Sequence, residues 1–103
     1  MNLKNCQNIF LKIYMNNKQI FGALAMDLKR VALGYHRGST FMAERFFEEA
    51  LKRKSEIDSK NLKPYLVKLL NDMDKLNKKE QKRAAEDALL YSTIFQNAST
   101  IIS

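Results

Sequence analysis

The chain is poor in the residues that build disulfides and metal sites. Its 103 residues include one cysteine, Cys6, one histidine, His36, and no tryptophan. A single cysteine excludes an internal disulfide, and one cysteine with one histidine cannot supply the four ligands of a Cys/His zinc site within one chain. We therefore expect no metal and no cofactor, and we expect Cys6 to be a small packing residue.

Glycine and proline are equally scarce, with three glycines and one proline. No stretch alternates apolar and polar residues over the length of a strand, so helical periodicity is the only repeating pattern. No apolar run approaches the roughly 18 residues of a transmembrane helix. Residues 1–16 mix Lys4, Lys12 and several asparagines with the apolar positions, which is unlike a secretory leader. The expectation is a cytoplasmic protein without a transmembrane segment.

A chain of this length forms one domain by the usual size relation. The sequence predicts an all-α fold, a compact bundle of four or five amphipathic helices in a single domain of residues 1–103. Within it, residues 1–16 are either a separate first helix or arm, or part of one long helix with a weak point at Asn16-Asn17. The apolar residues of this segment repeat mostly at three- and four-residue steps. They are Leu3, Cys6, Phe10, Ile13 and Tyr14.

Five further boundaries follow from capping and turn residues. Asn17 is a good N-cap type for the second helix, and Gly34 and Gly38 supply the permissive backbone for its end. Ser39 or Thr40 caps the next helix, Pro64 suits the first turn of another, and Asn77-Lys78-Lys79-Glu80 resembles a capping box before the last. The helical stripes predict a core of large apolar residues. These are Phe21, Leu24, Leu28, Val31, Phe46, Phe47, Leu51, Leu66, Leu69, Leu70, Leu89 and Phe95.

The clearest departure from an ordinary domain is positive charge. Lysine and arginine number 18 against 11 acids, for a net charge of +7, and the first 38 residues contain six of the bases and one acid, Asp27. Such an asymmetry favours an acidic partner for the N-terminal half, whether nucleic acid, acidic protein or anionic lipid.

The turn around Gly34 to Gly38 is the most specific candidate for a binding site. Lys29 and His36 lie seven residues apart, as do Arg30 and Arg37, so a continuing helix would present all four on one side. The next helix begins at Ser39 or Thr40, and free N–H groups at a helix start favour anions. We expect these six residues to bind an anion or an acidic partner, the alternative being that Arg37 only caps the helix or stays solvated.

No catalytic signature accompanies these features, because Cys6 has no partner base in the sequence and the glutamates of residues 44–49 have no histidine beside them. We expect a non-enzymatic interaction or regulatory module that self-associates, as a homodimer or larger homo-oligomer, or that binds a protein with an acidic surface. The first segment fits this expectation as a dimer contact. The alternative is a protein that binds nucleic acid by electrostatics. An enzyme would instead reveal a deep pocket with converging polar groups.

Overall fold

The computed structural model describes residues 16–60 and 62–101, and the regular structure of these residues is entirely helical. The elements are α2 (Asn17–His36), α3 (Thr40–Ser55), α4 (Pro64–Asp72), the short 3₁₀ helix η1 (Met73–Lys78) and α5 (Gln81–Ile101). The prediction of an all-α bundle is confirmed. The first predicted stripe, Leu3 to Tyr14, lies outside the described residues.

Helix α2 begins one residue earlier than its predicted cap implies. Asn16 is the N-cap, and its side chain accepts the Gln19 N–H at 3.0 Å while the Gln19 side chain accepts the Asn16 N–H at 3.2 Å. The predicted cap, Asn17, has another role, because its amide donates to the carbonyl of Asp58 at 2.7 Å and accepts the Asp58 N–H at 3.0 Å. Asn17 therefore ties the start of α2 to the segment that follows α3.

The reversal between α2 and α3 depends on two glycines in different ways. Gly34 lies inside α2, and a Cβ placed on it would lie 2.7 Å from the backbone nitrogen of Ala43, so it permits a close approach of α3. Gly38 has a φ of 76°, in the left-handed region that favours glycine. Ser39 is the N-cap of α3, as predicted, and its hydroxyl accepts the Met42 N–H at 3.3 Å.

The second half of the chain confirms one predicted boundary and corrects another. Pro64 begins α4, where its missing N–H is one that the helix leaves unpaired in any case. The predicted capping box at Asn77 is wrong, because Asn77 lies within η1 and α5 begins only at Gln81. The side chains of Met73 and Leu76 are fully buried, which keeps this segment helical and packed on the bundle.

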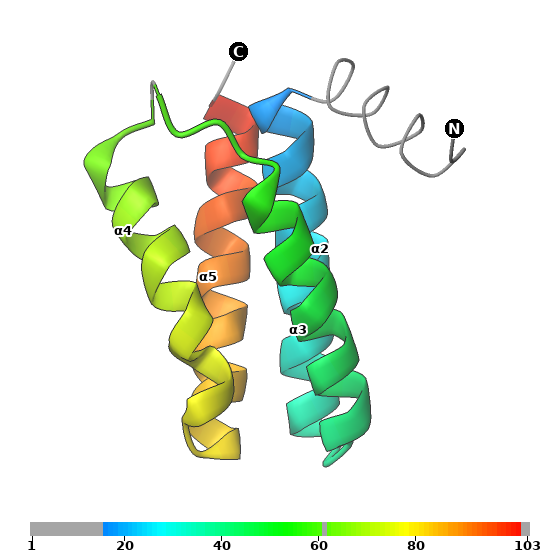
Figure 1. The fold of residues 1–103 in the computed structure, drawn as a ribbon. Helices are drawn as coiled ribbons and strands as arrows, with labels where there is room; N and C mark the ends of the chain where they lie inside the picture. The colour runs from blue at the N-terminus through cyan, green and yellow to red at the C-terminus, as the bar shows by residue number, and fades with distance from the viewer. Residues whose placement is uncertain (1–15, 61, 102–103) are drawn as a thin grey trace, which may run out of the picture.

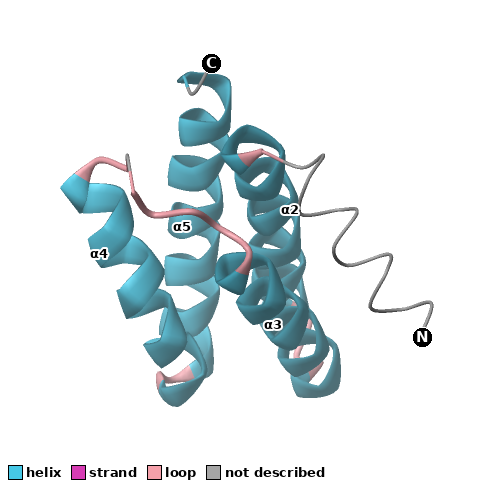
Figure 2. Ribbon diagram, turned by 45° about the horizontal axis from the view of Figure 1, so that its top comes forward, coloured by secondary structure: helices cyan, strands magenta, loops and turns pink. Residues whose placement is uncertain are grey.

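In the assembled fold, α2 lies between α3 and α5 and contacts both along its length, whereas η1 packs on α5 and, less extensively, on α3 (Figure 1). Helices α2 and α5 run in opposite directions. The connection that follows α3 passes across the bundle toward α4 (Figure 2). Two hydroxyls on α5 hold it close to α2, since Ser92 donates to the carbonyl of Ala25 at 2.8 Å and Ser99 to that of Lys18 at 2.9 Å.

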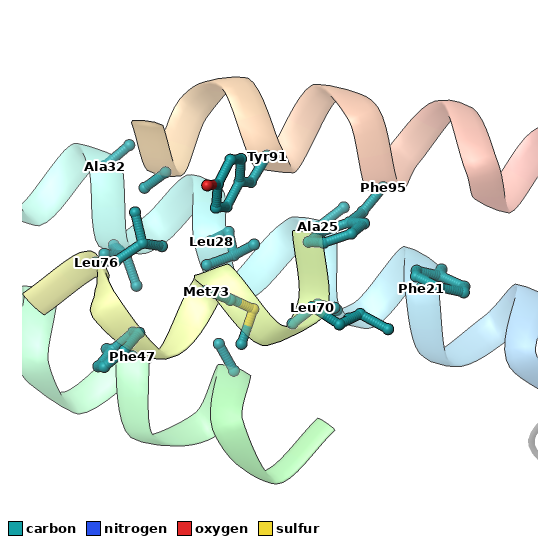
Figure 3. Close-up of a cluster of buried hydrophobic side chains, with 14 of the residues drawn as sticks. Phe21, Ala25, Leu28, Ala32, Phe47, Leu70, Met73, Leu76, Tyr91 and Phe95 are labelled. Carbon is teal, nitrogen blue, oxygen red and sulfur yellow. The ribbon is translucent and has the colours of Figure 1, made fainter. Parts of the chain in front are cut away.

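The core lies between these helices, with Phe21, Leu28, Met73 and Phe95 among its larger side chains (Figure 3). Most of the twelve predicted core residues are buried or packed against the core, but Leu89 is 51% exposed and that prediction is wrong. The inward stripe of α5 instead runs through three alanines, Tyr91 and Phe95. The alanines are Ala84, Ala88 and Ala98.

Candidate functional site

The six predicted site residues do not come together in one place. Lys29 and His36 both face the side of α2 that meets α5. Arg30 lies on the opposite side, toward α3, where its guanidinium sits 5.4 Å from the centre of the Phe46 ring and its Nη1 lies 3.4 Å from Oδ1 of Asp27. The physical reason is the bundle itself, because α3 and α5 pack on two different sides of α2 and divide neighbouring residues between them.

The turn keeps part of the predicted anion geometry. The backbone N–H of Ser39 is not free for an anion, because it donates to the carbonyl of Gly34 at 2.8 Å, and the hydroxyl of Ser39 caps Met42. The N–H of Thr40, at the first position of α3, has no hydrogen-bond partner among the described residues. Arg37 is exposed beside it, and its side chain makes no ion pair within the described part of the chain. Arg37 and Thr40 therefore remain the part of the site that is open to a partner.

Asp27 is an ionisable side chain that sequence reasoning did not single out. It is buried between α2 and α3, with Arg30 at 3.4 Å and the Nε of Arg53 at 3.8 Å. Burial raises the pKa of this carboxyl above its usual value, and the two arginines oppose that effect only in part. The helical pattern could have marked this carboxylate, because Asp27 is three residues from Leu24 and four from Val31 on the buried stripe of α2. The pattern does not say, however, that an arginine of α3 lies opposite it.

A concave groove lies between the outer sides of α2 and α5. Its first part has a volume of about 350 Å³. Four of the seven residues that line this part are apolar or small, and the other three are Lys29, His36 and Glu86. The apolar lining consists of Ala32, Leu33, Ala85 and Leu89. Its exposed apolar side chains are of the kind that pack against an apolar partner surface.

The groove continues along the same two helices toward the middle of the bundle. This second part has a volume of about 300 Å³, shares Lys29 and Leu89 with the first, and adds Met26 on α2 and Thr93 on α5. We call the two parts together the α2–α5 groove. Met26, Leu33 and Leu89 are 47%, 39% and 51% exposed, so three large apolar side chains lie along it. Met26 and Leu33 are seven residues apart and lie off the main stripe of α2, which is the sequence signal that could have revealed this surface.

Other kinds of site find little support in the described ranges. No group of three or more histidine, cysteine, aspartate or glutamate side chains within residues 16–60 and 62–101 is placed to hold a metal ion. Among the same residues, no helix is long and apolar enough to cross a membrane.

In comparisons with known proteins, no family model, no curated protein and no solved structure matches this chain. The functional argument therefore depends on the groove and on the charged surface alone.

Proposed function

We propose that this chain is a non-enzymatic helical interaction module that self-associates through the α2–α5 groove. The observation that carries the proposal is the line of exposed Met26, Leu33 and Leu89 along a groove that several alanines also line. Exposed apolar patches of this kind mark interaction surfaces in soluble domains. The few charges at its edges, Lys29 and Glu86, have opposite sign and can pair across an interface between two copies.

The test compares two neighbouring leucines of α5. Leu89 lies in the α2–α5 groove, whereas Leu90 is equally exposed, at 55% against 51%, but is absent from the lining of the groove. Sedimentation should show the wild-type chain as a dimer or larger oligomer. Leu89→Lys should dissociate it, because the interface would then have to bury a charged ammonium in place of an apolar side chain. Leu90→Lys should leave the oligomer intact.

Two results would contradict the proposal. If the wild-type chain sediments as a monomer at all concentrations, it does not self-associate and the proposal is wrong. If Leu90→Lys and Leu89→Lys dissociate the oligomer to the same extent, the interface is elsewhere on α5. Circular dichroism of both variants should match the wild type, since neither side chain belongs to the buried core.

The second candidate function, electrostatic binding of nucleic acid, is favoured by the position of the basic residues. The α2–α3 turn and the start of α5 lie at the same end of the bundle (Figure 1). Exposed bases from both turns therefore share that end. They include Arg37, Lys78, Lys82 and Arg83. Lys79 is held by an ion pair with Asp87 and contributes less.

A titration with duplex and single-stranded DNA and RNA at two salt concentrations tests this second candidate. Binding should weaken steeply as salt rises, because phosphate contacts release counterions. Arg37→Ala should weaken it by about 1.5–3 kcal/mol, the range for hydrogen bonds to charged groups. Lys60→Ala, a change of the same sign in the connection after α3, serves as the control. Equal losses from the two variants would mean that net charge alone, and not this end of the bundle, drives binding.

A further inference from the structure

The shape of the α2–α5 groove suggests what occupies it, on the premise that the proposed self-association is correct. Its walls are two antiparallel helices, and its lining residues recur along each wall at helical steps. On α2 these are Met26, Lys29 and Leu33, and on α5 they are Ala85, Leu89 and Gln96. A furrow between two helices that exposes apolar side chains along its length is the shape that accepts the apolar face of a third helix.

The chain contains one amphipathic segment outside the described bundle. Leu3, Cys6, Phe10 and Ile13 follow one another at steps of three, four and three residues, which is the spacing of an a/d stripe. On a helix, Asn8 would fall on the side opposite this stripe. The segment contains no acidic residue. Such a segment offers large apolar side chains, Phe10 above all, to pack against the exposed Met26, Leu33 and Leu89 of the groove.

The reach of this segment favours a second copy over the same chain. As a helix, residues 3–14 would span about 18 Å at roughly 1.5 Å per residue. The capping box at Asn16 sets where α2 begins, and Leu33 lies 16 residues beyond Asn17, or about 24 Å along α2 at the same rise. A helix that doubled back from Asn16 would stop about one turn short of Leu33 and Ala85, which line the most apolar part of the groove.

We propose that residues 3–14 of a second copy dock as a helix in the α2–α5 groove, and that the reciprocal exchange of this segment forms the dimer. The segment of a second copy is not tethered to Asn16 of the chain it binds, so it can lie over the full line from Met26 to Leu33. The two copies thereby cover each other's exposed apolar residues.

A mixture of two differently labelled proteins tests the exchange. One carries Cys6→Ala with Asn8→Cys, so that a spin label sits on the solvent side of the docked segment and the chain contains no other cysteine. The other is ¹⁵N-labelled and carries Cys6→Ala alone. After subunit exchange, the amide signals of Lys29, Leu33, Ala85 and Leu89 should broaden in the ¹⁵N-labelled copy, relative to a mixture with the reduced label. The amide signal of Glu48, on α3, should not broaden.

The outcomes separate the possible occupants. Broadening in the mixture establishes that the segment of one copy lies in the groove of another. Broadening only when label and isotope are on the same chain means that the segment folds back on its own bundle, which overturns the proposal. No broadening at the groove in either sample, with a dimer still present by sedimentation, means that another part of the second copy covers the groove. In that case the exchange is wrong, and the comparison of Leu89→Lys with Leu90→Lys decides separately whether self-association uses the groove.

A pair of glutamate variants adds an energetic readout. Phe10→Glu places a carboxylate on the docking stripe, and it should raise the dimer dissociation constant by about tenfold or more, as expected for loss of an aromatic anchor. Asn8→Glu introduces the same charge on the opposite side of the same segment and should change the constant little. Equal effects of the two variants would contradict docking through the stripe, because charge alone would then explain them.

Discussion

Gly34 and Gly22 lie on the same helix, but a methyl group meets different surroundings at the two positions. At Gly34 it would lie 2.7 Å from the backbone nitrogen of Ala43 and 3.0 Å from its Cα, where relief requires α3 to move. At Gly22 the nearest neighbour is the Ser99 hydroxyl at 3.4 Å, an ordinary contact. We therefore expect alanine to lower the stability of the fold at position 34 and to raise it at position 22.

We expect Gly34→Ala to destabilise the fold by about 1–3 kcal/mol, the usual range for overpacking, despite the better helix propensity of alanine. Gly22→Ala should stabilise it by about 0.5–1 kcal/mol, because alanine loses less backbone entropy in a helix. Denaturant unfolding of both variants against the wild type measures the two effects. A Gly34→Ala protein as stable as the wild type would mean that α2 and α3 are not in close contact at this point.

Asp27 predicts a pH effect on stability. Its pKa is raised in the folded protein above the ordinary value of 3.8, chiefly because burial disfavours the charged carboxylate. The folded state then binds this proton more tightly than the unfolded state does. The stability that Asp27 contributes is therefore greatest below pH 3.8 and is lost as pH rises through the folded-state pKa.

At pH 7, the free energy of unfolding of Asp27→Asn should accordingly equal or exceed that of the wild type. The difference between the two proteins should shrink as the pH falls toward 4. Urea unfolding at several pH values measures this, with Glu48→Gln as a control for general charge effects, since Glu48 is exposed and makes no ion pair within the described residues. A variant that is clearly less stable at pH 7 would show that the pairs with Arg30 and Arg53 outweigh the burial.

At the scale of a whole element, the start of α3 assigns different roles to two adjacent hydroxyls. The Ser39 hydroxyl accepts the Met42 N–H at 3.3 Å, whereas the exposed Thr40 side chain makes no hydrogen bond within the described residues. Ser39→Ala should therefore cost about 1 kcal/mol of folding free energy, and Thr40→Ala should cost little. Thermal unfolding of the two variants checks this. If Thr40→Ala proves the more damaging, the cap of α3 is not the one described.

At the scale of the whole molecule, the proposed dimer through the α2–α5 groove predicts that stability depends on protein concentration. A dimer that covers Met26, Leu33 and Leu89 binds the folded state only, so mass action raises the melting temperature with protein concentration. We expect this rise for the wild-type chain and for Leu90→Lys, and no rise for Leu89→Lys. A melting temperature independent of concentration in all three proteins would show that folding and association are not linked.

The sequence by itself determined the class of the fold and many local details. The fold class follows from helical stripes in a chain with little glycine and proline. The local details are the cap at Ser39, the position of Pro64 at the start of α4 and the left-handed turn at Gly38. Each of these features depends only on residues within about one helical turn of one another, so it can be predicted from neighbouring positions in the sequence. The burial of Phe21 and Leu24 followed from the same periodicity.

Only the tertiary structure decided which neighbour covers each side of a helix. Periodicity defines a stripe, but α5 packs on both α2 and η1, so Tyr91 faces inward and Leu89 faces outward. The same crossing of helices separated Arg30 from Lys29 and His36, and it buried Asp27 between two arginines. These outcomes depend on residues tens of positions apart meeting in space, and no local repeat of apolar residues carries that information.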